Sequence, residues 1–266
     1  MSGFQKTDYS ALDRPEVGAL IFHPRPELGP PSFRQGLSDH LIGVDQNIKI
    51  GARFHITAPE CATILFFHGN GEIAADYDDL GPLYNELGIN FMAVDYRGYG
   101  RSGGTPMVSA MMRDAHAIFD YAHTWLHSNN FNGPLIIMGR SLGSASALEL
   151  AAGHSSRMAG LIIESGFAFS EPLLQLLGID TKAIGFNEQA GFANLDKIRT
   201  YSGPTLVIHA EFDHIIPYSD GQALYDASPS AAKRILRIDG ANHNDIMMRG
   251  MEDYLNAIDA FVSKLF

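Results

Sequence analysis

Short apolar runs recur along the chain, and longer stretches in which apolar residues repeat at helical spacing separate them. The runs are continuous in Val, Ile, Leu, Phe and Met, which is typical of strands buried on both faces. They occupy residues 62–67, 89–96, 134–139, 158–165, 204–210 and 233–239, and two further strands are predicted within 37–57. Strands that alternate with helices form a mostly parallel sheet with helices on both faces. The pattern therefore predicts an α/β fold with a central sheet of about eight strands.

Two helices are well defined by the pattern. One has Thr105 as N-cap and Pro106 at its first position, and its apolar residues recur on one face as far as Trp125. The last helix is predicted to begin after Asn244 or Asp245. Folds of this kind bind ligands at the carboxyl ends of their strands, so residues at those ends are the first candidates for chemistry.

Length and composition restrict the organisation and the partners. The 266 residues, 45% hydrophobic and 18% charged, fit one domain over 1–266, with a Pro-rich arm over 1–35 and a small cap segment over 165–202. A net charge of -11 argues against nucleic acid and anionic membranes as partners, because both would be repelled. The one cysteine, Cys61, excludes an intramolecular disulfide, and no stretch reaches the ~18 apolar residues of a membrane span. We expect a cytoplasmic protein.

One strand passes directly into a helix through a serine flanked by glycines. Residues 135–152 read "LIIMGRSLGSASALELAA", a G-x-S-x-G pattern centred on Ser141. A nucleophilic serine at this place requires a sharp turn and a strained, positive φ. Gly139 and Gly143 leave room for that turn, and the helix that follows directs the Leu142 N–H toward the reacting centre. We therefore interpret Ser141 as a nucleophile and Leu142 as an oxyanion donor.

A second Gly-rich turn ends an earlier strand. The sequence "FFHGNGE" covers 66–72, and its turn can present a backbone N–H from Asn70, with Gly71 as the alternative. That N–H would complete an oxyanion hole together with Leu142.

A serine hydroxyl is a poor nucleophile at neutral pH and needs a base. Downstream of the serine, "HAEFDHIIP" offers Asp213 after a strand, and "DGANHND" offers His243 before the last helix. His243 would take the serine proton, and Asp213 would fix the imidazole tautomer. Glu164, at the end of the strand "LIIES", is the alternative acid.

These motifs together carry a resemblance to a known family. The sequence resembles the α/β-hydrolase superfamily, in particular the serine-hydrolase branch related to serine aminopeptidases and abhydrolase-domain acyl-protein thioesterases. The matching pieces span about 37–264 in family order; they are "LFFHGNGE", "VDYRGYGRSGG", "IIMGRSLGSASAL", "LIIESGFAF", "LVIHAEFDHIIP" and "GANHND". The resemblance implies a Ser-His-Asp triad of Ser141, His243 and Asp213, with an oxyanion hole from Asn70 and Leu142. The chain departs from relatives at Ala210, where they usually carry glycine, and it lacks the N-terminal cysteine cluster of the thioesterases.

Neither a cofactor nor a metal is expected. "GYGRSG" at 98–103 matches G-x-G-x-x-G, but a dinucleotide fingerprint needs its helix to begin within the glycines, whereas this helix is predicted from Thr105. We interpret it as a structural loop in which Arg97 pairs locally. No carboxylate or cysteine at useful spacing completes a metal site with the histidines of the following helix, His116, His123 and His127.

The substrate is defined only by class. The segment 167–201 is too short for a separate cap domain but rich in Leu, Ile and Phe. It either lines an acyl pocket, which would favour an ester or thioester with a medium or longer acyl chain, or packs against the sheet. An aminopeptidase or amidase, with an ammonium clamp from Glu164, Glu171 or Glu188, and a non-catalytic binding protein of the same fold remain as alternatives.

Overall fold

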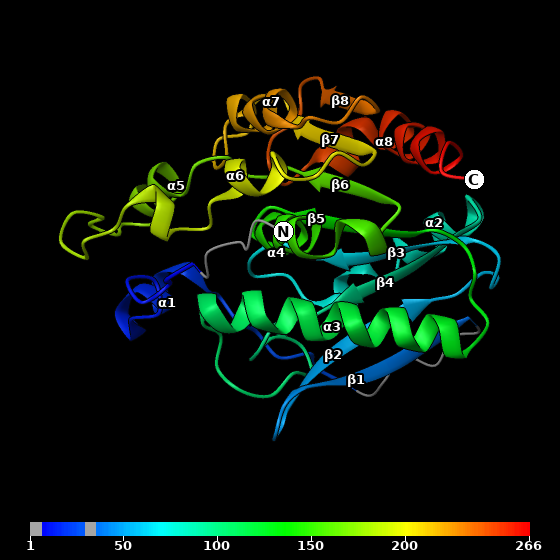
Figure 1. Cartoon of the computed structure of the whole chain (residues 1–266), viewed down its shortest axis with the longest axis horizontal. Helices are drawn as coiled ribbons and strands as arrows, with labels where there is room; N and C mark the ends of the chain where they lie inside the picture. The colour runs from blue at the N-terminus through cyan, green and yellow to red at the C-terminus, as the bar shows by residue number, and fades with distance from the viewer. Residues whose placement is uncertain (1–6, 30–35) are drawn as a thin grey trace.

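The computed structural model describes residues 7–29 and 36–266, and it is organised around one eight-stranded sheet (Figure 1). The strands are β1 (Leu37–Asp45), β2 (Ile48–His55), β3 (Ala62–Phe67), β4 (Ile89–Val94), β5 (Leu135–Arg140), β6 (Gly160–Glu164), β7 (Thr205–Ala210) and β8 (Lys233–Ile238). Their spatial order is β1-β2-β4-β3-β5-β6-β7-β8. The predicted number of strands is confirmed.

The sheet is mostly parallel, as expected. β2 pairs antiparallel with β1 and β4, and every other neighbouring pair runs parallel. The register brings the carboxyl ends of the central strands level, with Phe67 opposite Gly139 and Arg140 opposite Glu164. The segments that leave β3, β5 and β6 therefore begin side by side, which is the position where this fold class binds ligands.

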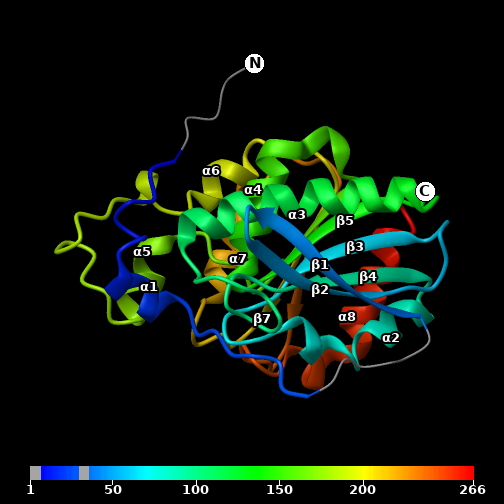
Figure 2. The same cartoon turned by 90° about the horizontal axis from the view of Figure 1, so that it is seen from below.

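Helices cover both faces of the sheet (Figure 2). α3, α4, α6 and α7 contribute to the apolar layer on one face, whereas α2 and α8 contribute to the layer on the other. The helices are α1 (Pro15–Ile21), α2 (Gly81–Glu86), α3 (Val108–Ser128), α4 (Gly143–His154), α5 (Ser170–Leu176), α6 (Asn194–Ile198), α7 (Tyr218–Ala227) and α8 (Ile246–Val262), with short 3₁₀ helices η1 (Ala74–Tyr77), η2 (Ser155–Arg157) and η3 (Glu188–Ala190).

The apolar runs serve both layers because successive strand residues point to opposite faces. In β3, Phe67 packs into the layer that contains α3 and α4, and Phe66 packs into the layer that contains α8. In β5, Ile137 and Met138 divide in the same way. A strand buried on both faces needs apolar residues at every position, which is why these segments show no alternation.

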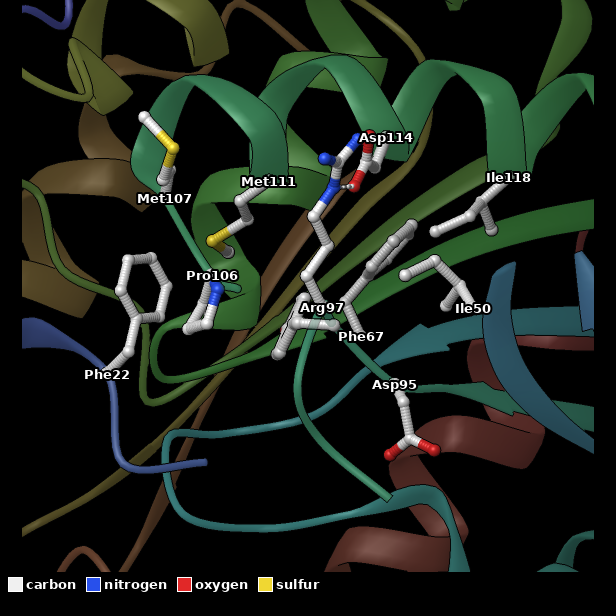
Figure 3. Close-up of a pocket in the computed structure, with 11 residues that line it drawn as sticks. Phe22, Ile50, Phe67, Asp95, Arg97, Pro106, Met107, Met111, Asp114 and Ile118 are labelled. Carbon is white, nitrogen blue, oxygen red and sulfur yellow. Dashed lines mark hydrogen bonds and ion pairs between the residues drawn. The ribbon is translucent and has the colours of Figure 1, made fainter. Parts of the chain in front are cut away.

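The expected start of α3 is wrong by two residues, about half a turn. The helix begins at Val108 with Met107 as N-cap, so Thr105 and Pro106 lie outside it. Figure 3 shows Pro106 on the segment leading into α3, facing a small cavity of about 10 Å³ that Arg97 and Asp114 also line. This space is about the size of one water molecule. The local pairing expected of Arg97 is confirmed: its Nε lies 2.6 Å from Asp114 Oδ2.

The N-terminal arm contains a helix that the Pro-rich pattern did not predict. α1 buries Val17 and Ile21. The extended part beyond it, to Gly29, is joined to the rest of the protein by a β-bridge between Pro26 and Gly100, whereas positions 30–35 of the predicted arm lie outside the described residues. In both views α1 lies beside α5 of the 165–202 segment (Figures 1 and 2).

Within the described parts of the chain, no helix is long and apolar enough to cross a membrane. The same residues contain no group of three or more His, Cys, Asp or Glu side chains that could hold a metal ion.

An ion-pair cluster fixes α6 to α4. Glu149 of α4 places Oε2 2.8 Å from Lys197 Nζ of α6 and Oε1 3.2 Å from His116 Nε2 of α3. Burial acts to raise the pKa of the Glu149 carboxyl, but the hydrogen bonds and charges of His116 and Lys197 outweigh it and lower the pKa to about 2. The ionised carboxylate therefore favours the folded state.

We expect Glu149→Gln to lower the free energy of unfolding by about 3 kcal/mol at pH 7, since one pKa unit corresponds to about 1.4 kcal/mol. The group has a depressed folded pKa, so its contribution is complete above pH 4.5, the ordinary value, and is lost as the pH falls toward 2. Urea unfolding of both proteins at several pH values measures the difference. Exposed Glu252→Gln should change stability by less than ~0.5 kcal/mol. A difference between wild type and Glu149→Gln that stays constant down to pH 2.5 would contradict this assignment.

Candidate active site

Ser141 occupies the turn between β5 and α4 in the backbone conformation that the motif predicts. Its φ is 51°, a left-handed value that is uncommon for a residue other than glycine, and its N–H donates to the Glu164 carbonyl at 2.9 Å. A Cβ at Gly139 would lie 2.3 Å from the Gly143 carbonyl oxygen, and one at Gly143 would lie 2.1 Å from the Phe67 carbonyl oxygen. Both glycines are therefore required by close backbone contact, and the turn holds the strained serine in place.

The structure brings together the three residues proposed as a triad. Ser141 Oγ lies 3.0 Å from His243 Nε2, and His243 Nδ1 lies 2.6 Å from Asp213 Oδ2. The histidine is on the loop between β8 and α8, and the acid is on the loop between β7 and α7. All three are at most 8% exposed.

The hydrogen-bond partners indicate which atoms of Asp213, His243 and Ser141 carry protons. An ionised carboxylate only accepts, so His243 Nδ1 carries a proton and Nε2 is free to accept from the serine hydroxyl. Burial acts to raise the pKa of Asp213, but the His243 hydrogen bond and the Ile215 and Ile216 N–H groups outweigh it and lower the pKa. Those two amides lie 3.0 and 2.8 Å from Asp213 Oδ1. Asp213 therefore places a fixed negative charge beside Nδ1 of His243, the ring nitrogen that does not contact Ser141.

Glu164, the alternative acid, has other partners. Its Oε1 accepts from Arg140 Nε at 3.0 Å and its Oε2 from the Tyr254 hydroxyl at 2.7 Å. Burial raises the pKa of this carboxyl. The geometry therefore favours Asp213 as the partner of His243.

Arg140, which directly precedes the serine, is a functional candidate that the sequence reasoning passed over. Its guanidinium binds Glu164 and Glu72, and its Nη2 donates to the His243 carbonyl at 2.8 Å. Glu72 in turn accepts from the Gly69 N–H at 2.7 Å. One side chain thus joins the serine turn, the Gly-rich turn and the histidine loop. Its position inside the G-x-S-x-G motif was the available signal, but the sequence did not reveal its partners.

The two expected oxyanion donors come from different turns and line the same pocket. Leu142 is the N-cap of α4, and Asn70 lies on the turn after β3. Within residues 7–29 and 36–266, neither backbone N–H donates a hydrogen bond to a protein group. The N–H of Gly71, the alternative donor, is close enough to the Tyr99 hydroxyl to lower the pKa of that group. Asn70 is therefore the better candidate on this side of the site.

A pocket of about 260 Å³ opens beside the serine. Ser141 and His243, with Asn70 and Leu142, are part of its wall. The rest of the lining is largely apolar and comes from the arm, the cap segment and the loop after β7; it includes Ile21, Phe167, Leu173, Leu174, Leu177, Phe192 and Ile215. At its polar end it is lined by His23, Glu72, Arg140 and Asn244.

Comparison with known proteins gives consistent results. The family described as "Serine aminopeptidase, S33" matches residues 58–181. Alpha/beta hydrolase domain-containing protein 17C of Mus musculus is 32% identical over 224 residues, which are 81% of this chain and 64% of that protein. The chain thus spans a little under two thirds of the length of this relative.

Solved structures resemble the chain in fold. An esterase of Pyrococcus furiosus superposes with a TM-score of 0.73 at 16% identity, covering 91% of this chain and 98% of the esterase. Est1E of Butyrivibrio proteoclasticus, solved with ferulic acid bound, has a TM-score of 0.71 at 19% identity, covering 85% and 98% respectively.

The sheet order, the helices on both faces and the turn that carries Ser141 define the architecture of an α/β hydrolase. The solved structures show that the chain has the α/β-hydrolase fold, and its sequence is similar to the serine aminopeptidase family over 58–181 and to an alpha/beta hydrolase domain-containing protein over most of its length.

The Arg140 cluster predicts an asymmetric response to mutation. Arg140→Met leaves the carboxylates of Glu72 and Glu164 without their cation, and we expect a loss of about 3–5 kcal/mol in the free energy of unfolding. Addition of Glu164→Gln removes the more buried carboxylate and should restore part of that loss. Chemical denaturation of the single and double variants measures both effects. If the double variant is as unstable as, or less stable than, Arg140→Met alone, the unpaired carboxylate is not the cause.

Proposed function

We propose that the protein is a serine hydrolase that cleaves a carboxylic ester or thioester through an acyl-enzyme, with Ser141 as nucleophile, His243 as base and Asp213 as the orienting acid. The observation that carries the proposal is the continuous hydrogen-bonded chain from Asp213 through His243 to Ser141 Oγ, at the wall of an apolar pocket. In this proposal no cofactor or metal takes part, and the substrate is a small-molecule acyl ester or thioester.

In the proposed mechanism His243 Nε2 takes the Ser141 proton as Oγ forms a bond to the substrate carbonyl carbon. The carbonyl oxygen becomes negative and accepts hydrogen bonds from the Asn70 and Leu142 N–H groups. Asp213 stabilises the imidazolium through Nδ1. His243 then returns the proton to the leaving oxygen or sulfur as its bond to the carbonyl carbon breaks. Water repeats the sequence on the acyl-enzyme and releases the acid.

The surroundings of the acidic residues favour an ester or thioester over an aminopeptidase substrate. An ammonium clamp needs a carboxylate with free oxygens in the pocket. Glu188 accepts from the Ser170 and Glu171 N–H groups, and Glu171 accepts from the Thr181 hydroxyl. Glu164 is held by Arg140 and Tyr254. None of these three carboxylates lines the pocket among the described residues, and Glu72, which does, is already bound by Arg140 and the Gly69 N–H.

The apolar lining supports an acyl chain as the group that enters the pocket. Leu173, Leu174 and Leu177 come from or follow α5, and Phe167 and Phe192 make an edge-to-face pair, with ring centroids 5.2 Å apart, that closes the inner side. The volume of about 260 Å³ is slightly below that of ordinary ligand pockets, ~300–1,000 Å³, which favours a chain of medium length.

The nucleophile is tested by covalent labelling. We expect one fluorophosphonate adduct per protein in the intact mass, because an activated serine displaces fluoride, and we expect none on Ser141→Ala. Nitrophenyl esters of short-chain acids should be hydrolysed by the wild type and not by the variant. A folded wild type that takes up no adduct would favour a non-catalytic binding protein of this fold.

The acyl pocket is tested with nitrophenyl esters of increasing chain length. Each methylene buried is worth about 0.8 kcal/mol, so kcat/KM should rise up to about fourfold per added CH₂ until the pocket is full, and then level or fall. Leu177→Trp should shorten the optimal chain by filling the pocket, and exposed Glu252→Gln should leave it unchanged. A series with no preference beyond acetate would contradict an acyl pocket.

A further inference from the structure

The Gly-rich turn that carries the proposed oxyanion donor has little conformational restraint of its own. Asn70 lies between Gly69 and Gly71, and Gly71 has a φ of 77°. Glycine populates both signs of φ at low cost, so a residue between two glycines can present its N–H in several directions. An oxyanion donor is effective only when it is already aimed at the developing charge. Something outside the turn must therefore orient Asn70.

The Asn70 side chain supplies that restraint through the N-terminal arm. Its Nδ2 donates to the Ile21 carbonyl at 2.7 Å and lies 2.8 Å from His23 Nδ1. Its Oδ1 accepts from the His23 N–H at 3.0 Å. Both ends of the amide are thus held by residues nearly fifty positions earlier in the chain, where the arm leaves α1.

Tyr99 also takes part in the hydrogen bonds between Asn70 and His23. Its hydroxyl donates to Asn70 Oδ1 at 2.7 Å and accepts from the His23 N–H at 2.8 Å. Burial raises the pKa of Tyr99, so the hydroxyl keeps the proton that it donates to Asn70.

The arm itself is firmly attached on both sides of this contact. On one side Ile21 and Phe22 are buried in the main apolar core. On the other, Arg25 Nε donates to the Gly71 carbonyl at 2.8 Å, and the Arg25 carbonyl accepts from the Gly100 N–H at 2.9 Å. The arm can therefore transmit a fixed position to the turn.

We propose that the N-terminal arm is part of the active site: through Ile21, His23 and Tyr99 it holds the Asn70 side chain, and so aims the Asn70 N–H at the oxyanion. Asn70 then has two separate parts to play, its main chain as donor and its side chain as positioning group. This inference rests on the proposed function of the site.

Two variants keep the backbone N–H and remove the restraint. Asn70→Ala removes all the side-chain hydrogen bonds, and Tyr99→Phe removes one donor and keeps the ring packing. Loss of a whole oxyanion donor lowers kcat by about 10²–10³-fold, so a donor that is present but poorly aimed should cost less. We expect kcat to fall about tenfold or more in Asn70→Ala and about threefold or more in Tyr99→Phe, with KM within twofold of wild type. Fluorophosphonate labelling of Ser141 should slow in parallel.

The controls separate positioning from general damage. Glu16→Ala, at an exposed position of α1 on the same arm, should label and turn over at the wild-type rate. The apparent pKa of kcat/KM should be the same in all the proteins, because the His243–Asp213 pair is untouched. Melting temperatures identify a variant that is inactive because it is unfolded. If Asn70→Ala is unfolded, Tyr99→Phe alone tests the proposal.

The outcomes are distinct. Slow labelling and low kcat with unchanged KM and pH midpoint support the proposal. Folded variants that label and turn over as fast as wild type would overturn it while leaving the serine hydrolase intact. A wild-type protein that takes up no label removes the proposed function, and this inference with it.

Discussion

A serine forced into left-handed backbone geometry is the constraint on which the site depends. The sharp β5–α4 turn imposes that conformation on Ser141, and the turn is possible because glycine at 139 and 143 lets the backbone approach closely. The strained backbone is tolerated because the turn is held between a strand buried on both faces and a helix packed against it. Small residues on α4 and level strand ends allow the other loops to approach the same point.

Buried charge organises the loops around this turn. Arg140 is bound by two carboxylates and donates to the His243 carbonyl, so its interactions reach three loops at once. Such a cluster contributes little net stability compared with apolar packing, but it is costly to disturb because each ion depends on the others. It therefore acts to fix geometry more than to strengthen the fold.

The sequence was sufficient for the features that depend on local pattern. Continuous apolar runs predicted the strands, and the motif at Ser141 predicted the positive φ. The sequence was insufficient for features that depend on contacts between residues far apart along the chain. α3 begins at Val108, and Pro106, expected at its first position, instead lines a small cavity together with Arg97. The choice between Asp213 and Glu164 depends on which carboxylate binds Arg140. The side-chain contacts of Asn70 join segments nearly fifty residues apart, and no local signal marks them.

The large sequence separation between the contacting residues also affects when the site can form during synthesis. Ser141 and His243 are 102 positions apart, and His243 lies beyond the last strand of the sheet. A chain emerging from the ribosome contains Ser141 well before His243, and the arm that includes α1 makes its contacts with Asn70 and Tyr99 only after the turns that follow β3 and β4 have been synthesised. Because domains of this kind fold as units, the contacts between Ser141, His243 and Asp213 can form only once the whole sheet is present. A fragment that ends before β8 would contain Ser141 but not the histidine that is proposed to act on it.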